Sequence, residues 1–248
     1  TGIDSEHEDL KDRYLSVRRK YNMDVQGHGT HCAGIAAAVV NNAKGIASIF
    51  PTNDYVQISS IKVLNDWGSG TQKGIIRGII EAADLGYDII SMSLGGPSND
   101  ASQKAYRRAV EYAHQKGCIV IVAAGNESDN ARNHVPAAVK GVITVSAINS
   151  QLKLASFSNT VQSVEMGISA PGEDILSCFP KNTYRSLNGT SMATPYVAAV
   201  AALARSINPD LDYKSMYALM NQTGLAIGDH ALAGNMVQPL DLIKAIGK

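Results

Sequence analysis

Short apolar runs alternate along the chain with stretches of helical spacing. Residues 55–63, 88–92, 118–123 and 142–147 are rich in valine and isoleucine, and polar or glycine-containing segments bound each of them. Most of these runs are continuous and do not alternate with polar residues, which is typical of strands that are buried on both faces of a sheet. We therefore predict a strand over each of the four ranges.

Helical patterns lie between these runs, at residues 70–85 and 103–116, and small-residue runs at 35–40 and 196–204 indicate buried helices. Repeated strand–helix–strand order predicts a parallel sheet with right-handed crossovers. Functional residues then gather at the carboxyl ends of the strands. No repeat, low-complexity tract or linker interrupts the pattern. We expect one α/β domain over residues 1–248, with a mostly parallel central sheet and helices on both faces.

Composition narrows the classes of function. The hydrophobic share is 45%, and Lys plus Arg equals Asp plus Glu at 22 each, so nothing indicates a nucleic-acid or anionic-membrane partner. The longest apolar runs are too short to cross a bilayer. The three cysteines, Cys32, Cys118 and Cys178, cannot all form disulfides within the chain, and we expect them to be small buried residues. The chain has no Cys-x-x-Cys or His-Glu-x-x-His zinc pattern.

The first segment with candidate chemistry is Gly-His-Gly-Thr-His-Cys-Ala-Gly at residues 27–34. His28 stands at the start of a predicted helix between two glycines, where a substrate backbone could approach it. Histidine can take up and return a proton near neutral pH. A lone histidine is more commonly a hydrogen-bonded structural residue, and this is the role that we expect for His31.

Two further segments place a polar side chain at the end of a strand or the start of a helix. Ser191 lies in Asn-Gly-Thr-Ser-Met-Ala-Thr-Pro, near the amino terminus of a predicted helix, where free N–H groups and the helix dipole favour negative charge. The alternative is a simple capping serine. Asn126 ends the segment Ala-Ala-Gly-Asn at residues 123–126, at the end of the strand predicted there, and its amide could donate to an oxyanion or occupy an ordinary turn.

Together these segments, in the order histidine, asparagine, serine, resemble the subtilases, the subtilisin-like serine proteases. The resemblance extends from residue 1 to the carboxyl end and includes Ser-Met-Ser-Leu-Gly-Gly at 91–96 and a late segment at 234–240. It implies a three-layer subtilisin-like α/β fold. It also implies a serine endopeptidase that works through a Ser-His-Asp triad and an acyl-enzyme intermediate, with no cofactor needed for the chemistry.

The resemblance assigns roles residue by residue. Ser191 would be the nucleophile and His28 the general base and acid, while the Ser191 N–H and the Asn126 amide would hold the oxyanion. An extended protein or peptide substrate would pair with two glycine-rich segments, which allow close backbone approach. These are Ser93, Leu94 and Gly95, and Gly68, Ser69 and Gly70.

The same resemblance outlines a specificity pocket. Ala124 and Gly125 would form part of its wall, and Glu127 would stand at its rim. His134 falls where many relatives carry a small residue on the pocket floor, so we expect a shallower pocket that tolerates large aromatic side chains poorly. The Val135–Pro136 peptide bond is expected to be cis.

A structural calcium ion is a further expectation of the resemblance. Asp9 matches a family calcium ligand, and calcium favours hard oxygen ligands on loops. The neighbouring loop at residues 41–45 is shorter than usual, however, and carries a lysine. A calcium ligand and a plain surface carboxylate both remain open for Asp9.

The pattern departs from the family at its start. The family motif is Asp-Thr-Gly-Ile or Asp-Ser-Gly-Ile, its first residue is the triad aspartate, and this sequence begins at the threonine. Asp4 lies beyond the turn and is no substitute. We expect the aspartate and its strand to come from an upstream segment that is cleaved but associated, held as a second chain, or outside the given sequence. The alternatives are a catalytically impaired subtilase-fold peptide-binding protein, or another serine hydrolase such as an esterase, which the substrate segments disfavour.

Maturation and compartment follow from the resemblance alone. Family members are usually made with an inhibitory amino-terminal pro-segment, which would be a partner of this chain, and secretion is favoured. The unpaired cysteine leaves an intracellular member open. The natural substrate and the oligomeric state are not predicted.

Overall fold

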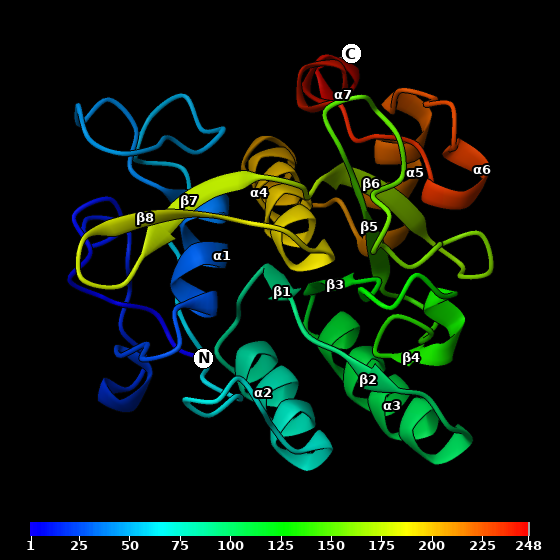
Figure 1. Ribbon diagram of the computed structural model, residues 1–248, viewed down its shortest axis with the longest axis horizontal. Coiled ribbons are helices and arrows are strands. Elements are labelled where there is room, and N and C mark those ends of the chain that lie inside the picture. The colour runs from blue at the N-terminus through cyan, green and yellow to red at the C-terminus, as the bar shows by residue number, and fades with distance from the viewer. Residues whose placement is uncertain (248) are drawn as a thin grey trace.

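The computed structural model describes residues 1–247, and a four-stranded parallel sheet lies at its centre (Figure 1). The strand order is β1-β3-β5-β6, with all three pairs parallel. The predicted strands at 88–92, 118–123 and 142–147 are confirmed within a residue at each end. The sheet consists of β1 (Ile89–Met92), β3 (Ile119–Ala123), β5 (Ile143–Ile148) and β6 (Gly167–Pro171).

Helices cover both faces of this sheet, which confirms the predicted three-layer architecture (Figure 1). In β3, Val120 and Val122 pack in one core with α2 and α3, whereas Ile119 and Ile121 pack in a second core with α4, α5 and α7. Alternate side chains of the strand thus fill opposite layers. The helices are α1 (His28–Ala37), α2 (Gln72–Asp84), α3 (Asp100–Gln115), α4 (Thr190–Ile207), α5 (Tyr213–Thr223), α6 (His230–Ala233) and α7 (Pro239–Ile246), with 3-10 turns η1 (Arg19–Tyr21) and η2 (Ala131–Asn133).

Capping residues set where the helices begin. α3 starts one turn before the predicted residue 103, because the Asn99 side chain accepts from the Ser102 N–H and the Ser102 hydroxyl accepts from the Asn99 N–H. In α2, the Thr71 hydroxyl accepts from the Gly74 N–H. No helix within residues 1–247 is long and apolar enough to cross a membrane.

Two antiparallel pairs complete the fold. β7 (Ile175–Phe179) and β8 (Thr183–Leu187) form a hairpin that packs against α1. β2 (Gly96–Pro97) pairs with β4 (His134–Val135), with Gly96 opposite Val135 and Pro97 opposite His134. The Val135–Pro136 bond is cis, as predicted.

The prediction of a strand at residues 55–63 is wrong, because within the described residues this segment makes only an isolated parallel bridge, between Ile58 and Tyr14. The segment pairs only on one side, where Ile58 exchanges backbone hydrogen bonds with Arg13 and Leu15. Its other side faces β1 across a cavity of about 870 Å³, so within residues 1–247 it has no second strand to complete a ladder. The lining is mixed in polarity, and its apolar part includes Ile61, Val63, Ile79, Met92 and Ala198.

Candidate active site

The amino terminus of α1 carries His28, and a buried carboxylate fixes this turn. Asp24 accepts hydrogen bonds from the Gly27 N–H, the Thr30 N–H and the Thr30 hydroxyl, each at 2.8 Å. Burial acts to raise the pKa of Asp24, but these hydrogen bonds outweigh it and lower the pKa below its ordinary value. Asp24 was not identified from the sequence, because it lies four residues before the start of α1 and outside the N-cap position, which is Gly27.

His28 lies one helical turn before Cys32, and its Nε2 is 3.9 Å from the Cys32 sulfur. Electrostatic attraction to Cys32 raises the pKa of His28, against the opposing effect of burial. The Thr1 hydroxyl accepts from the Gly29 N–H at 2.8 Å, so the start of the chain lies against the turn that carries His28. His31 is buried and contacts the Arg185 carbonyl at 2.9 Å, a structural contact.

Asp4 is engaged elsewhere. Its carboxylate accepts from the Glu6 N–H at 3.2 Å and from the Lys181 N–H at 2.8 Å. These bonds hold the side chain toward the β7–β8 turn, and no hydrogen bond joins it to His28 within the described residues.

Ser191 is the second residue of α4, and its carbonyl group is bonded by residues outside the helix. Pro195 has no N–H, so the Ser191 carbonyl lacks its helical donor. The Ser93 hydroxyl donates to this carbonyl instead at 2.8 Å, and the Cys32 sulfur lies 3.4 Å from it. Cys32 therefore contacts both the His28 ring and the Ser191 backbone, which brings the two predicted catalytic residues to the same place.

Asn126 is oriented by Thr190, whose role was not predicted from the sequence. Its side-chain oxygen accepts from the Thr190 N–H at 2.8 Å and from the Thr190 hydroxyl at 3.0 Å. A Cβ placed on Gly189 would lie 3.5 Å from the Ser191 nitrogen and 3.7 Å from Asn126 Nδ2. Two N–H donors thus border one small space beside Gly189, whose φ of 151° favours glycine. Such a pair of donors can stabilise a developing oxyanion.

Both predicted substrate segments leave backbone groups free, although residues 68–70 use some of theirs in a turn. Ser69 closes a turn with Asn65, because its carbonyl accepts from the Asn65 N–H at 2.8 Å and its N–H donates to the Asn65 side chain. The Gly68 carbonyl and the Gly70 N–H have no partner within residues 1–247. Leu94 is half-buried and Gly95 is exposed next to β2.

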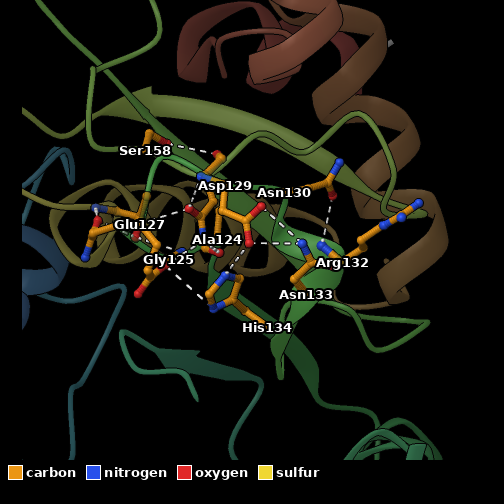
Figure 2. A network of polar contacts seen from close by, with 12 residues as sticks. Ala124, Gly125, Glu127, Asp129, Asn130, Arg132, Asn133, His134 and Ser158 are labelled. Atoms are coloured by element: carbon orange, nitrogen blue, oxygen red, sulfur yellow. Dashed lines mark hydrogen bonds and ion pairs between the residues drawn. The ribbon is translucent and has the colours of Figure 1, made fainter. Parts of the chain in front are cut away.

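The predicted specificity pocket contains a polar cluster (Figure 2). His134 Nδ1 lies 3.6 Å from Glu127 Oε2, and its Nε2 lies 3.3 Å from Asp129 Oδ2. Asn133 donates to both oxygens of Asp129, and these bonds are the main reason that the pKa of Asp129 is lowered. In the view of Figure 2, the imidazole lies below Ala124, Gly125 and Asp129. Asp129 and Asn133 were not identified from the sequence.

The surroundings of Asp9 do not fit a calcium ion. Its buried carboxylate accepts from the Asn42 amide at 2.6 Å, the Ile46 N–H at 3.0 Å and the Tyr184 hydroxyl at 2.9 Å. These groups are donors, whereas calcium requires oxygen acceptors. Burial and the bond to Asp9 raise the pKa of Tyr184, which keeps it a donor. Within residues 1–247, no group of three or more His, Cys, Asp or Glu side chains could hold a metal ion.

The α/β fold and the grouping of His28, Ser191 and Asn126 are those of a hydrolase. Comparisons with known proteins identify its family. The family model described as "Subtilase family" matches residues 1–237. Subtilisin DY of Bacillus licheniformis is 42% identical over 92% of this chain and 82% of its own length. Thermitase of Thermoactinomyces vulgaris is 42% identical over 83% and 72%, respectively. A cold adapted subtilisin-like serine proteinase superposes with a TM-score of 0.82 at 33% identity, over 95% of this chain and 85% of that structure.

The chain belongs to the subtilase family. It is a serine-type endopeptidase of the subtilisin type, and peptides are its substrates. The relatives are named as proteases, and nothing in the comparisons supports the alternative of an impaired peptide-binding protein.

Proposed function

We propose that Ser191 attacks the peptide carbonyl while His28 takes up its hydroxyl proton. His28 then gives this proton to the leaving amine, which departs as the acyl-enzyme forms. Water completes the cycle when His28 takes a proton from it and returns the proton to Ser191. The contacts of Cys32 with both residues support this pairing, because they hold α1 and the start of α4 together.

The observation that carries the proposal is the pair of donors beside Gly189. The negative charge on the tetrahedral intermediate would lie there, between the Ser191 N–H and Asn126 Nδ2. The helix dipole of α4 has its positive end at the same point. Thr190 supports this role because it holds the amide oxygen of Asn126, and this leaves the nitrogen for the substrate.

We infer that the third member of the triad is a carboxylate on a strand that fills the cavity. The cavity lies between two unpaired edges, β1 and residues 58–63, and its lining includes Thr1 and His28. A strand in this place would satisfy both edges and cover apolar surface. In the family motif the aspartate directly precedes the threonine, which here lies against the His28 turn.

We further propose that the substrate binds in an extended conformation between residues 68–70 and 93–95. The free backbone groups of Gly68 and Gly70 support this arrangement, since a substrate strand needs unpaired partners. The pocket beside Gly125 would be shallow, because His134 is held there by Glu127 and Asp129. We expect peptides with phenylalanine before the scissile bond to be cleaved more slowly than those with smaller residues.

The experiment is labelling with a fluorophosphonate probe, comparing the protein as purified with its Ser191→Ala variant. We expect rapid labelling at Ser191 alone, which adduct mapping would establish. A folded protein that is not labelled, or is labelled at another serine, would refute the assignment. Hydrogen exchange of the β1 amides tests the strand independently: slow exchange indicates a paired edge, and fast exchange an open one.

A further inference from the structure

Asn159 follows β5 and is fully buried, yet its side chain serves the loop that carries Asn126. We refer to residues 124–129 as the Asn126 loop. Asn159 Nδ2 donates to the Ala124 carbonyl at 3.0 Å and to Glu127 Oε2 at 2.7 Å. Its Oδ1 accepts from the N–H groups of Glu127 at 3.0 Å and Asp129 at 2.9 Å.

These four bonds use every hydrogen-bonding site of the Asn159 side-chain amide. Both N–H donors and both lone pairs are used, so only one orientation of the Asn159 side chain satisfies the loop. The Asn159 backbone N–H adds a fifth bond, to the Gly125 carbonyl at 3.0 Å. Any side chain at Gly125, whose φ is 106°, would collide with the Asn159 amide. Asn159 therefore contacts the loop closely along most of its length.

The opposite side of the loop is held by Thr190. Its hydroxyl accepts from the Gly125 N–H at 3.2 Å, and Asn126 Oδ1 accepts from its N–H. Asn126 thus lies between two anchors: Thr190 belongs to the nucleophile's own helix, and Asn159 belongs to the segment that connects β5 and β6. A displacement of about 1 Å in such a donor can cost about 10²-fold in rate.

We propose that Asn159 is a positioning residue for catalysis. It sets Asn126 Nδ2 against the oxyanion space and, through the same amide, holds the Glu127 carboxylate at the rim of the specificity pocket. The inference rests on the proposed role of Asn126 and deepens it, because one buried side chain then governs both the rate and the substrate preference.

The first test compares Asn159→Ala with Asn149→Ala. Asn149 is a matched control, because its Oδ1 also accepts two backbone N–H groups, from Gln151 and Lys153, in a turn outside the candidate site. We expect Asn159→Ala to lower kcat and the rate of Ser191 labelling by about 10–10²-fold with KM changed less than about threefold. Asn149→Ala should leave both rates within about twofold. A kcat for folded Asn159→Ala within about twofold of wild type would overturn the proposal.

A double-mutant cycle separates positioning from loss of stability. Once Asn126→Leu has removed the donor, adding Asn159→Ala should slow labelling no further, because there is nothing left to position. An equal reduction in both backgrounds would show that Asn159 does not act through Asn126, and would refute the inference.

Asn159→Asp gives a pH signature that keeps the inference testable if the alanine variant does not fold. The introduced carboxyl would face Glu127 Oε2 in place of a donor, and two carboxyls at that distance share one proton. We expect this variant to lose activity as pH rises, opposite to the acid limb set by His28, and Glu127→Gln to restore much of it. A pH profile parallel to that of wild type would overturn the proposal.

The outcomes also distinguish failure of the proposed function from failure of the role inferred for Asn159. If wild-type Ser191 is not labelled, the proposed function and this inference fail together. If Ser191 is labelled and Asn126→Leu slows it, but Asn159→Ala does not, only the inference about Asn159 fails.

Discussion

Asp24→Asn tests whether one carboxylate holds the turn that carries His28. Asparagine keeps one acceptor oxygen, which can serve either the Gly27 or the Thr30 N–H, but its NH₂ group replaces the other acceptor. Thr30 is fully buried, and a buried N–H without an acceptor costs about 1–3 kcal/mol. Loss of the charge weakens the remaining bond by about 1 kcal/mol. We therefore expect Asp24→Asn to lower the free energy of unfolding by about 2–4 kcal/mol at pH 7.

The pH dependence has a definite sign. The folded-state pKa of Asp24 lies below its unfolded value, so its contribution is complete above the unfolded pKa and is lost as pH falls through the folded pKa. The difference between Asp24→Asn and the parent should therefore shrink below about pH 4.

Urea unfolding in a Ser191→Ala background, which prevents self-digestion, measures this difference. Asp12→Asn, at an exposed carboxylate, is the matched control and should change stability by less than about 0.5 kcal/mol. An Asp24→Asn effect as small as that of the control, or one that is the same at pH 7 and at the lowest pH where both proteins fold, would refute the reasoning.

Three further predictions concern the site and its support. Asn126→Leu should lower kcat by about 10²–10³-fold, as loss of the corresponding donor does in subtilisin, with little change in KM. Steady-state kinetics on a peptide amide measures this effect, and an unchanged kcat would exclude the Asn126 amide from the oxyanion space. Cys32→Ala removes the main group that raises the pKa of His28, so the acid limb of the kcat/KM profile should move to lower pH; a fixed or upward-shifted limb contradicts this. Tyr184→Phe should lower the free energy of unfolding by about 1–3 kcal/mol, because it removes a hydrogen-bond donor to the buried Asp9 carboxylate. A chelator should leave the midpoint of thermal unfolding unchanged. A midpoint that the chelator lowers would indicate a bound cation that the geometry around Asp9 does not explain.

The sequence predicted the central sheet where burial alone decides structure. Residues 118–123 and 142–147 form strands because continuous Val and Ile runs fit a layer covered on both sides. β6 (Gly167–Pro171) escaped prediction because its Gly-Ile-Ser-Ala-Pro sequence has weak strand propensity, and pairing with β5 over five positions makes it a strand. Residues 55–63 show the reverse case: their sequence is typical of a strand, but no neighbouring strand pairs with them within the described residues.

The candidate site divides in a similar way. His28, Asn126 and Ser191 stood out because each lies in a glycine-containing motif at the end of a strand or the start of a helix. Thr190 and Asn159 did not, because their importance lies in side-chain bonds to residues more than 30 positions away. Asp9 matched a family calcium ligand, but the sequence could not show that three donors would surround its carboxylate.

The interrupted ladder of α4 also provides a spectroscopic reporter. The Ser191 carbonyl is bonded by a hydroxyl and contacted by a thiol, each from a different segment of the chain, where a regular helix would supply a peptide N–H. An isotope label on this one carbonyl would give an infrared band whose frequency records whether the three segments have come together. Assembly of the site during refolding could then be followed at a single bond, with no substrate present.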